Sequence, residues 1–516
     1  MKLRFGQIFL VASIISLIVT ILWLAYPSSN RMYHIILTGI GRGRMHPYKA
    51  KFEPYKGRRM GGAAGMATVI KETVASFSGE PFNIFSLGTE ISGTADSYFT
   101  RGLSIVKILN ILGIEAMLPG NIEFSYGQKR LAELAEEAQF ALVSSNITET
   151  ESGRTPGFIS PELILNPGLG LKIGVMGITS PETPNLTARS NIEGLAFARP
   201  DESLRLRVEA LRRSGVDLVV LLTQYSRERV TIDDWKAIAS AAPDICVMLD
   251  YDIEAPSPLR KDGIVVTTIS GYNQTKEIDV LDLEITPPPV RIVRIAGRRI
   301  PVDHAEINAD PDVEALVEQL TRQTRDLRDS MVGSFAEDYG KSYSSECFIG
   351  NMITDAMRAE SGCEIAMQNS GGIQNNIQAG DFTLGDLFSI MPFDNQMVQM
   401  ELKGSDILEL LKIAASRQRG VLQVSGLSYT FRHRSPADYG LVAAKTGETA
   451  VDPEKYYSVI TNNFLADGGD NFLPFRNGRN LSYGRQQRDV VKDYIAGLSR
   501  SGPVSLRIEG RVVAEE

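Results

Sequence analysis

The side chains best suited to metal chemistry follow apolar runs of the sequence. Asn121 comes after the run 105–118, Glu90 after the run 82–88, and Asp250 and Asp252 end the run 244–252. Carboxylate and amide oxygens of this kind are the ligands that hard cations such as Mg²⁺ and Ca²⁺ prefer. The set could therefore hold one divalent ion. In the same loop as Asn121, however, Ile122 stands where a histidine would be useful.

Imidazole and thiol groups are scarce. The chain has four histidines, of which His34 lies inside an apolar run and is expected to be a satisfied core imidazole. The three cysteines form no CxxC pair, so they present neither zinc spacing nor a disulfide framework, and we expect buried thiols. They are Cys246, Cys347 and Cys363.

The totals indicate a globular protein with more than one domain. A length of 516 residues exceeds what one hydrophobic core usually supports, which predicts two domains. A net charge of −8 without a dense basic patch argues against binding of duplex nucleic acid. Small molecules or proteins are the expected partners, and the sequence specifies no particular protein partner.

The N-terminal residues predict a membrane anchor. Residues 7–26 carry no charge, and as a helix of 20 residues they would span about 30 Å, the thickness of a bilayer core. Lys2 and Arg4 on the short side place the chain from about residue 28 outside the cytoplasm. We therefore expect residues 1–30 to be an uncleaved anchor of a periplasmic or cell-surface protein, with a cleaved signal segment as the alternative.

Alternating strand and helix patterns predict a layered α/β domain over residues 31–300. Buried strands are expected at 33–39, 82–88, 140–146, 171–180, 216–224 and 244–252, and helices at 61–77, 98–112, 203–214 and 232–241. Val, Ile and Leu dominate these strands, which indicates helices on both faces of a sheet. Ligands of such folds gather beyond the carboxyl ends of the strands.

A second domain is expected after a linker. Three prolines at 287–289 end the sheet region, and the polar stretch 310–332, with Asp310 as its N-cap, predicts a linker helix within residues 301–340. Residues 341–516 then form an α+β domain, with a helix at 348–360 and strands within 420–431 and 456–470.

Five motifs of this second domain resemble the C-terminal domain of the 5′-nucleotidase family, which includes UDP-sugar hydrolases and 2′,3′-cyclic phosphodiesterases. They are IGNMITDAMR (349–358), NSGGI (369–373), MPFDN (391–395), LQVSGLSYTF (422–431) and NNFLADGGD (462–470). Upstream, MGGAAGMATVIKE (60–72), GNIEF (120–124) and LKIGVMGITSPET (171–183) are similar to the family's metallophosphoesterase domain. The resemblance implies a first domain that holds two divalent metals, a second that grips a nucleoside, and a hinge helix.

The resemblance also implies seven metal ligands, of which this chain keeps only Asn121. The six replaced positions are Ile40, Arg42, Thr89, Gln224, Asp250 and Asp252. Beside them, Ile122 and Ser125 replace the family's catalytic histidine and its acidic partner. A hydroxyl at Thr89 cannot neutralise two cations as a bridging carboxylate does. Arg42 adds a repulsion of about 4 kcal/mol at about 4 Å and an effective dielectric near 20. We therefore expect no catalytic residue, no dinuclear centre and no cofactor, while a single divalent ion at Asn121, Asp250 and Asp252 stays an alternative.

For the second domain the resemblance implies a nucleoside site. Its candidates are Asn369, Gly371, Gly372, Phe393, Asn395, Phe464 and Asp470. Phe464 matches one of two stacking rings, Asp470 the acid that binds ribose, and Asn395 an amide that contacts the base. Gln374 replaces the family's arginine, and Val421 stands where the second ring is expected. The same glycines would also serve simple turns, so the motifs could persist for folding alone.

Three functions follow from these patterns. The first is a membrane-anchored, extracytoplasmic and noncatalytic relative of the 5′-nucleotidases that binds a nucleoside, nucleotide or other ligand, or serves as a scaffold. The second is an active metal-dependent hydrolase of nucleotides or other phosphate esters, with a rebuilt site around Asp250 and Asp252. The third is a structural partner in an envelope complex whose pocket is unused.

Overall fold

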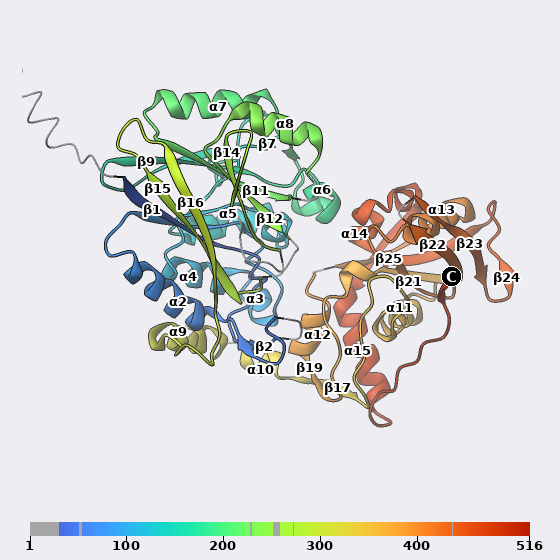
Figure 1. Cartoon of the computed structure of the whole chain (residues 1–516). Helices are drawn as coiled ribbons and strands as arrows, with labels where there is room; N and C mark the ends of the chain where they lie inside the picture. The colour runs from blue at the N-terminus through green and yellow to red at the C-terminus, as the bar shows by residue number, and fades with distance from the viewer. Residues whose placement is uncertain are drawn as a thin grey trace, which may run out of the picture.

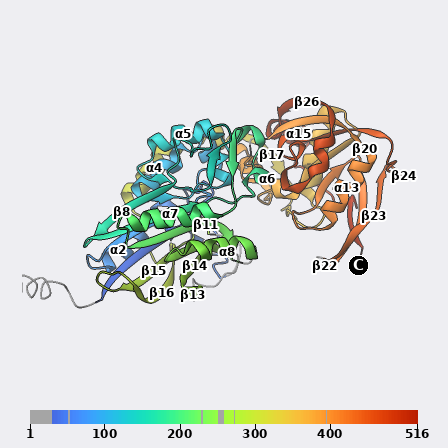
Figure 2. The same ribbon diagram turned by 90° about the horizontal axis from the view of Figure 1, so that it is seen from above.

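The chain folds into two α/β domains that lie side by side (Figure 1 and Figure 2). The computed structural model describes residues 30–50, 54–227, 230–250, 258–271, 273–322, 324–393, 395–435 and 437–515. Within these ranges no helix is both long and apolar enough to cross a membrane. The predicted anchor at residues 7–26 and the metal candidate Asp252 lie outside the described residues.

Two six-stranded sheets form the first domain. The first sheet has the order β16-β15-β1-β4-β5-β6, and the second has the order β13-β14-β12-β11-β9-β8. The strands of the first sheet are β1 (Arg31–Thr38), β4 (Phe82–Ser86), β5 (Ala116–Met117), β6 (Ala141–Leu142), β15 (Glu277–Ile285) and β16 (Ile292–Pro301). Those of the second are β8 (Glu162–Gly168), β9 (Leu171–Ile178), β11 (Leu218–Ser226), β12 (Ile245–Asp250), β13 (Leu259–Lys261) and β14 (Ile264–Ser270).

The two sheets share one core and carry helices on their outer faces. Tyr33 and Phe85 from the first sheet pack with Val175, Val220 and Val247 from the second, all fully buried. Burial on both faces explains the unbroken apolar runs of the sequence. The helices are α2 (Ala63–Ser76), α3 (Ala95–Phe99), α4 (Leu103–Ile111), α5 (Gln128–Glu137), α6 (Thr183–Leu186), α7 (Glu202–Arg213) and α8 (Ile232–Ala241). Short elements complete the domain: β2 (Tyr48–Lys49), β3 (Arg59–Met60), β7 (Ile147–Glu149), β10 (Leu195–Phe197) and the 3-10 turns η1 (Asn121–Phe124) and η2 (Arg189–Asn191).

Local predictions in this domain were partly wrong. The helix expected at 98–112 is divided into α3 and α4 by Gly102, whose φ of 84° is left-handed. The strand expected at 140–146 pairs only over Ala141–Leu142, because Ser144 N then bonds Ser160 O and Ser145 N bonds Gly177 O. His34 is a satisfied core imidazole, as predicted, with Asp282 at 2.6 Å and Glu80 at 2.9 Å. The three cysteines are buried and unpaired, as expected.

The stretch 310–332 is not one linker helix. It forms α9 (Pro311–Arg322), α10 (Arg325–Arg328) and the start of β17 (Met331–Phe335). Asp310 caps α9, since its Oδ1 accepts from Val313 N at 3.1 Å. Val313 and Val317 are buried against α2 in the first domain's core. Two buried valines four residues apart are therefore enough to pack this polar helix against the first domain.

The second domain is a five-stranded sheet, in the order β21-β18-β25-β20-β26, between two unlike layers. Its strands are β18 (Ile365–Asn369), β20 (Gln396–Lys403), β21 (Leu422–Ser425), β25 (Tyr456–Asn462) and β26 (Arg479–Gln486). One face packs on α11 (Phe348–Ser361) and α15 (Gln487–Ser499). The other packs on α13 (Gly404–Ala415) and a sheet of β22 (Ser428–Ser435), β23 (Asp438–Thr446), β24 (Thr449–Ala450) and β27 (Val512–Glu515).

The strands expected in this domain lie within the two predicted runs. The run 420–431 contains β21 and β22, which belong to different sheets. The run 456–470 is a strand only to Asn462, whose side chain then caps α14 (Asn463–Ala466) by accepting from Leu465 N. The remaining elements are α12 (Leu384–Ile390), β19 (Gly380–Thr383) and the 3-10 turns η3 (Ser370–Gly372), η4 (Gly469–Asn471) and η5 (Leu473–Asn477).

Candidate functional site

The loops predicted to form a site meet at the carboxyl edge of the first domain's parallel strands. After β1, Ile40 N donates to Gly88 O and Arg42 N donates to Thr89 O, both at 2.8 Å. From the second sheet, Gln224 Nε2 donates to Leu87 O at 3.2 Å. The described positions that the sequence placed in one site are therefore neighbours in space.

The Glu123 side chain connects two of these loops, although no function was assigned to it from the sequence. Its fully buried carboxylate accepts from Thr89 N at 3.0 Å, from Glu90 N at 2.7 Å and from Gly120 N at 2.7 Å. Burial raises the pKa of Glu123, although these backbone donors oppose the shift. The only available signal was a single charged residue inside an otherwise apolar turn.

The backbone of the site keeps an uncommon conformation. Ile40, Arg42 and Thr89 have φ values of 60°, 51° and 60°. For β-branched residues such a left-handed conformation is a genuine outlier, and it costs about 1–3 kcal/mol per residue. The loop hydrogen bonds and Glu123 hold it. The shape of the loops therefore does not depend on metal-binding side chains.

Arg42 reaches across the cleft to the second domain. Its Nη1 donates to Gln374 Oε1 at 3.0 Å, and Gln374 Nε2 donates to Gly371 O at 2.5 Å. Both residues differ from those that the resemblance to the 5′-nucleotidases implies: Arg42 replaces a histidine, and Gln374 replaces an arginine. A guanidinium thus enters the cleft from the first domain instead of the second.

The described candidates for a single metal ion are bound to protein groups. Asp250 forms an ion pair with Arg227 Nη2 at 2.9 Å. Glu90 accepts from Ser86 Oγ at 2.8 Å and from Gly41 N at 3.1 Å, and burial raises the pKa of Glu90 to about 7. Asn121 Nδ2 lies 3.5 Å from Leu186 O.

These donors do not fit a pair of divalent cations. Two adjacent ions need several available carboxylate or imidazole ligands. The described edge offers amides, a hydroxyl and three carboxylates that are already engaged: Asp250 pairs with Arg227, and Glu90 and Glu123 accept hydrogen bonds from the loops. Across the described ranges, no three His, Cys, Asp or Glu side chains are grouped so that they could hold a metal. We derive no catalytic step through such a centre.

On the second domain, Asp470 is held by a network of buried amides. Asn369 Nδ2 donates to Asp470 Oδ2 at 2.7 Å, and Gln368 Nε2 donates to Asn369 Oδ1 at 3.1 Å. Gln368 Oε1 in turn accepts from Asn462 at 3.0 Å and from Gln487 at 2.6 Å. Burial raises the pKa of Asp470, while Asn369 and the charge of Arg419 oppose the shift.

The other predicted nucleoside residues surround this network. The half-buried ring of Phe464 lies against Gly469, where a Cβ would come within 2.5 Å of it. A Cβ at Gly371 would lie 3.3 Å from Asp470 Oδ2, and one at Gly372 would clash with the Gln368 amide. Phe393 O accepts from Arg488 Nη1 at 3.2 Å, and Asn395 O accepts from Gln487 N at 2.8 Å. The seven residues are thus neighbours, and their binding of a nucleoside stays a prediction.

Sequence reasoning missed one aromatic residue here. Val421 is fully buried and offers no ring, but its N–H donates at 3.0 Å to the carbonyl of Tyr343. The ring of Tyr343 is 49% exposed, and its Cε2 would lie 3.8 Å from a Cβ at Gly371 and 3.2 Å from one at Gly420. Tyr343 therefore stands beside the expected ring position, although it comes from a distant part of the sequence.

The domains also contact each other on one flank of the Arg42–Gln374 bridge through α6. This short helix packs on η4, which carries Asp470. Nearby, Arg189 N donates to Asp467 Oδ2 at 3.3 Å, and Arg419 lies 3.8 Å from Glu182. Figure 1 shows α6 at the edge of the first domain that faces α14.

A second flank joins α3 to α12 and α15. The Phe388 ring centroid lies 4.4 Å from that of Tyr98, and the Arg488 guanidinium lies 4.3 Å from the Tyr98 ring and 3.7 Å from the Phe388 ring. Asp96 accepts from Thr324 Oγ1 at 2.8 Å. The site is thus enclosed by two interdomain contacts.

Comparison with known proteins agrees with this architecture. The 5′-nucleotidase C-terminal domain matches residues 325–476. The crystal structure of a 5′-nucleotidase precursor from Thermus thermophilus has a TM-score of 0.81 and 24% identity, covering 94% of this chain and 99% of that one. Residues 325–476 therefore belong to the family of 5′-nucleotidase C-terminal domains, and proteins similar to most of the chain are named 5′-nucleotidases.

Two further relatives are similar to most of this chain. A snake venom 5′-nucleotidase from Gloydius brevicauda is 26% identical over 88% of this chain and 83% of its own length. Endonuclease YhcR from Bacillus subtilis is 24% identical over 80% of this chain. The chain spans only about a third of the length of this endonuclease and of a second Bacillus subtilis relative.

Proposed function

We propose that this 5′-nucleotidase-family protein binds a nucleoside or nucleotide between its domains and does not hydrolyse it with a metal pair. The observation that carries the proposal is the bond from Arg42 Nη1 to Gln374 Oε1 at 3.0 Å. The bond joins two positions that both depart from the family pattern, and it places a fixed positive charge in the cleft where the family uses metal cations.

Electrostatics supports the loss of the dinuclear centre. A guanidinium about 4 Å from a cation is repelled by about 4 kcal/mol at an effective dielectric near 20. A single ion at Asp250 would have to displace Arg227, which lies 2.9 Å from the carboxylate. The Arg227 side chain is 42% exposed, so the pair is only partly buried, and an ion would compete with the guanidinium for this carboxylate.

The second domain supports ligand binding. Asp470 presents a carboxylate that Asn369 fixes in place at 2.7 Å, and a ribose could hydrogen-bond to it. Phe464 lies against Gly469, the residue before this acid, and Tyr343 lies near Gly371, whose Cβ would contact the Asp470 carboxylate. A base that stacks on an aromatic ring gains about 1–3 kcal/mol. A nucleoside is therefore the ligand class that these groups fit best.

We also propose that the protein is membrane-anchored and extracytoplasmic. The support is the uncharged run at residues 7–26 with Lys2 and Arg4 before it. A relative that carries the name of a snake venom enzyme is consistent with a location outside the cytoplasm.

Phosphate release by the detergent-solubilised full chain tests the proposal. The substrates are AMP, UMP, UDP-glucose and 2′,3′-cyclic AMP, each with Mn²⁺, Mg²⁺, Ca²⁺ or Zn²⁺. We expect no release above that of the Asp250→Ala variant, together with saturable calorimetric binding of adenosine or uridine nucleotides. Metal-dependent turnover that Asp250→Ala abolishes would establish the hydrolase alternative. The absence of both turnover and binding would leave the structural role in an envelope complex.

A further inference from the structure

We propose that the edge of the first domain opposite the cleft docks on a membrane surface that contains anionic lipid. The inference rests on the membrane anchor of the proposed function and goes beyond it. We call this edge the docking face. It is defined by Leu169, Arg260, Arg291, Val293 and Arg294.

Strand register places these residues at one end of the domain. Arg31, which begins β1, pairs with Ile285, and Ile285 pairs with Ile292 near the start of β16. Arg31 Nη1 also donates to Leu169 O at 3.1 Å, at the tip of the hairpin between β8 and β9. The cleft loops follow the opposite ends of the strands. In Figure 1 the dark blue start of β1 lies at the end of the first domain away from the second domain.

Arginines gather at the start of β16. Arg291 and Arg294 are exposed, and Arg260 crosses from β13 to donate from Nη2 to Ile292 O at 2.5 Å, between them in sequence. The nearest acid on this strand pair is Glu284, 3.7 Å from Arg294 Nη1, and Arg294 is 85% exposed. Such an exposed pair contributes little. Asp217 is a second acid at this end, since it lines a small pocket with Arg31 and Leu169. Four arginines against these two acids leave the local charge positive, although the chain as a whole carries −8.

Exposed apolar side chains accompany these arginines. Leu169 is 64% exposed, Val293 46% and Leu259 42%. Basic residues mixed with exposed apolar ones are typical of surfaces that lie at a lipid interface. Each Lys or Arg near an anionic leaflet contributes about 1 kcal/mol.

The length of the connecting chain favours lipid as the occupant. From residue 26, the end of the uncharged run, to Arg31 there are five residues, which extended reach at most about 18 Å. The headgroup layer beyond the hydrocarbon core is about 5–8 Å thick on each side. If 7–26 spans the bilayer, the docking face lies within about 13 Å of the headgroups, which leaves little room for a folded protein domain between them.

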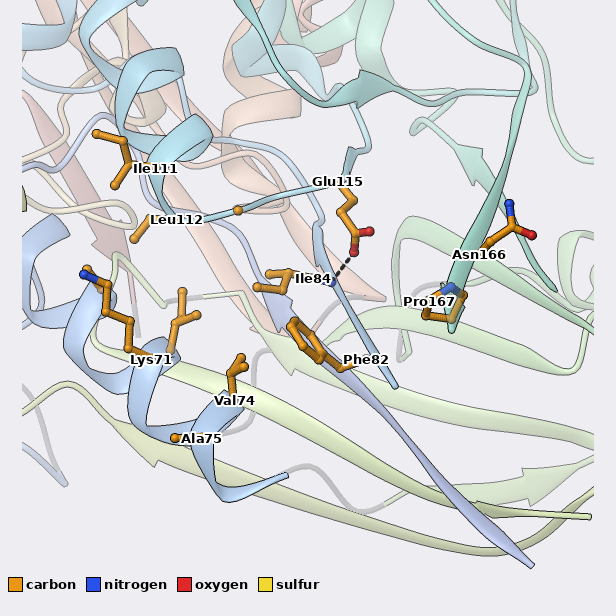
Figure 3. A pocket seen from close by; sticks show the side chains of 13 residues that line it. Lys71, Val74, Ala75, Phe82, Ile84, Ile111, Leu112, Glu115, Asn166 and Pro167 are labelled. Carbon is orange, nitrogen blue, oxygen red and sulfur yellow. Dashed lines mark hydrogen bonds between the residues drawn. The ribbon is translucent and has the colours of Figure 1, made fainter. Parts of the chain in front are cut away.

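A recess of about 730 Å³ adjoins the docking face between α2, β4, α4 and β8 (Figure 3). Both of its charged groups are already bound: Lys71 Nζ lies 2.5 Å from Asp310 Oδ2, and Glu115 accepts from Asn83 Nδ2 and from Ile84 N. The exposed amide of Asn166 is the other polar side chain of the wall. Its walls add apolar surface beside the docking face, from Phe82, Ile111 and Pro167.

Fluorescence quenching on the full chain tests the docking face. A dye is attached at Leu169→Cys or, as a control on the second domain, at the 48% exposed Leu473→Cys, since the native cysteines are buried. Vesicles contain a quencher lipid in phosphatidylcholine, with or without phosphatidylglycerol. We expect at least threefold stronger quenching at 169 than at 473. Phosphatidylglycerol should strengthen the quenching at 169, and salt should weaken it.

Two charge variants of equal size sharpen this test. Arg260→Gln, Arg291→Gln and Arg294→Gln together should remove the gain from phosphatidylglycerol. Arg432→Gln, Arg479→Gln and Arg485→Gln on the second domain should keep it. Equal quenching at both labels, or a gain that survives the first triple variant, would overturn the proposal. So would shielding of the 169 label from iodide in detergent without lipid, because this would indicate contact with a second copy.

Flotation separates failure of the docking face from failure of the anchor. If the protein floats with phosphatidylcholine vesicles, the anchor is supported. If the labels at 169 and 473 are then quenched equally, the docking face is overturned and the anchor is not. Flotation only with phosphatidylglycerol, lost in the docking-face triple variant, supports the docking face and overturns the anchor. Flotation with neither lipid overturns both.

Discussion

The two halves of the cleft differ in what holds them together. In the first domain, backbone hydrogen bonds and the Glu123 carboxylate hold the loops, and those bonds do not involve the side chains of Ile40, Arg42 and Thr89, although the Ile40 side chain packs into the core. In the second domain, Asp470 itself belongs to the buried amide network through Asn369. The loops of the first domain can therefore keep their conformation when the metal-binding side chains are replaced. In the second domain, replacing Asp470 would also disrupt the hydrogen-bond network that holds the site together.

Replacing the Glu123 carboxylate tests the first half of this comparison and should have the largest effect. Glu123→Ala leaves three buried N–H groups without their acceptor, and each unsatisfied group costs about 1–3 kcal/mol. We expect the first unfolding transition to lose more than about 3 kcal/mol in denaturant titration. Glu133→Ala, at an exposed position, is the control. A loss below about 1 kcal/mol, the low end for one such group, would mean that other contacts support the loops.

The pH dependence of stability tests the same scaffold at Glu90. Burial raises the pKa of Glu90 to about 7 in the folded protein, from 4.5, so the folded state binds this proton more tightly. The resulting stabilisation is complete below about pH 4.5 and is lost as pH rises through 7, on the order of 3 kcal/mol. Glu90→Gln keeps an oxygen acceptor for Gly41 N and should flatten the melting temperature between pH 4.5 and 8. A slope unchanged from that of the natural chain would assign the titration to another group.

Aromatic substitutions test the second half of the cleft. Phe464→Ala and Tyr343→Ala should each weaken nucleotide binding by about 1–3 kcal/mol, or about 5- to 150-fold in Kd, because a stacking surface is lost. Calorimetry measures the effect, and Tyr439→Ala, 41% exposed on β23, is the control. Binding heats that stay unchanged in both variants would place the ligand elsewhere.

The bridge between the halves should show the smallest effect. In a double-mutant cycle, Arg42→Ala and Gln374→Ala should couple by about 0.5–1.5 kcal/mol of unfolding free energy, the usual contribution of one hydrogen bond. Arg189→Ala with Gln374→Ala is the matched control, since no contact is observed between these two described side chains. A coupling of zero would mean that the two substitutions are independent.

The sequence predicted the parts of the fold that local burial decides. The strands around Leu37, Val175, Val220 and Val247 were expected within a few residues, because continuous apolar runs need two covered faces. The helix break was missed although its cause is local, the left-handed conformation of Gly102. The short strand at Ala141 was missed because Ser144 and Ser145 then bond to segments distant in the sequence.

The sequence predicted which loops meet at the candidate site, but it did not predict which side chains contact one another there. Strand order alone brings Ile40, Thr89 and Gln224 to one edge. The partner of Arg42 lies 332 residues away in the sequence, and no periodicity points to it. Tyr343 was missed for the same reason, because the motif it accompanies begins far downstream.

Metal content tests the central claim most directly. The purified full chain is equilibrated with excess Mn²⁺, dialysed, and analysed for manganese by inductively coupled plasma mass spectrometry. We expect fewer than one manganese ion per chain, and the same value in Asn121→Ala. Two ions per chain, reduced in Asn121→Ala, would contradict the account and make metal-dependent hydrolysis the function to pursue.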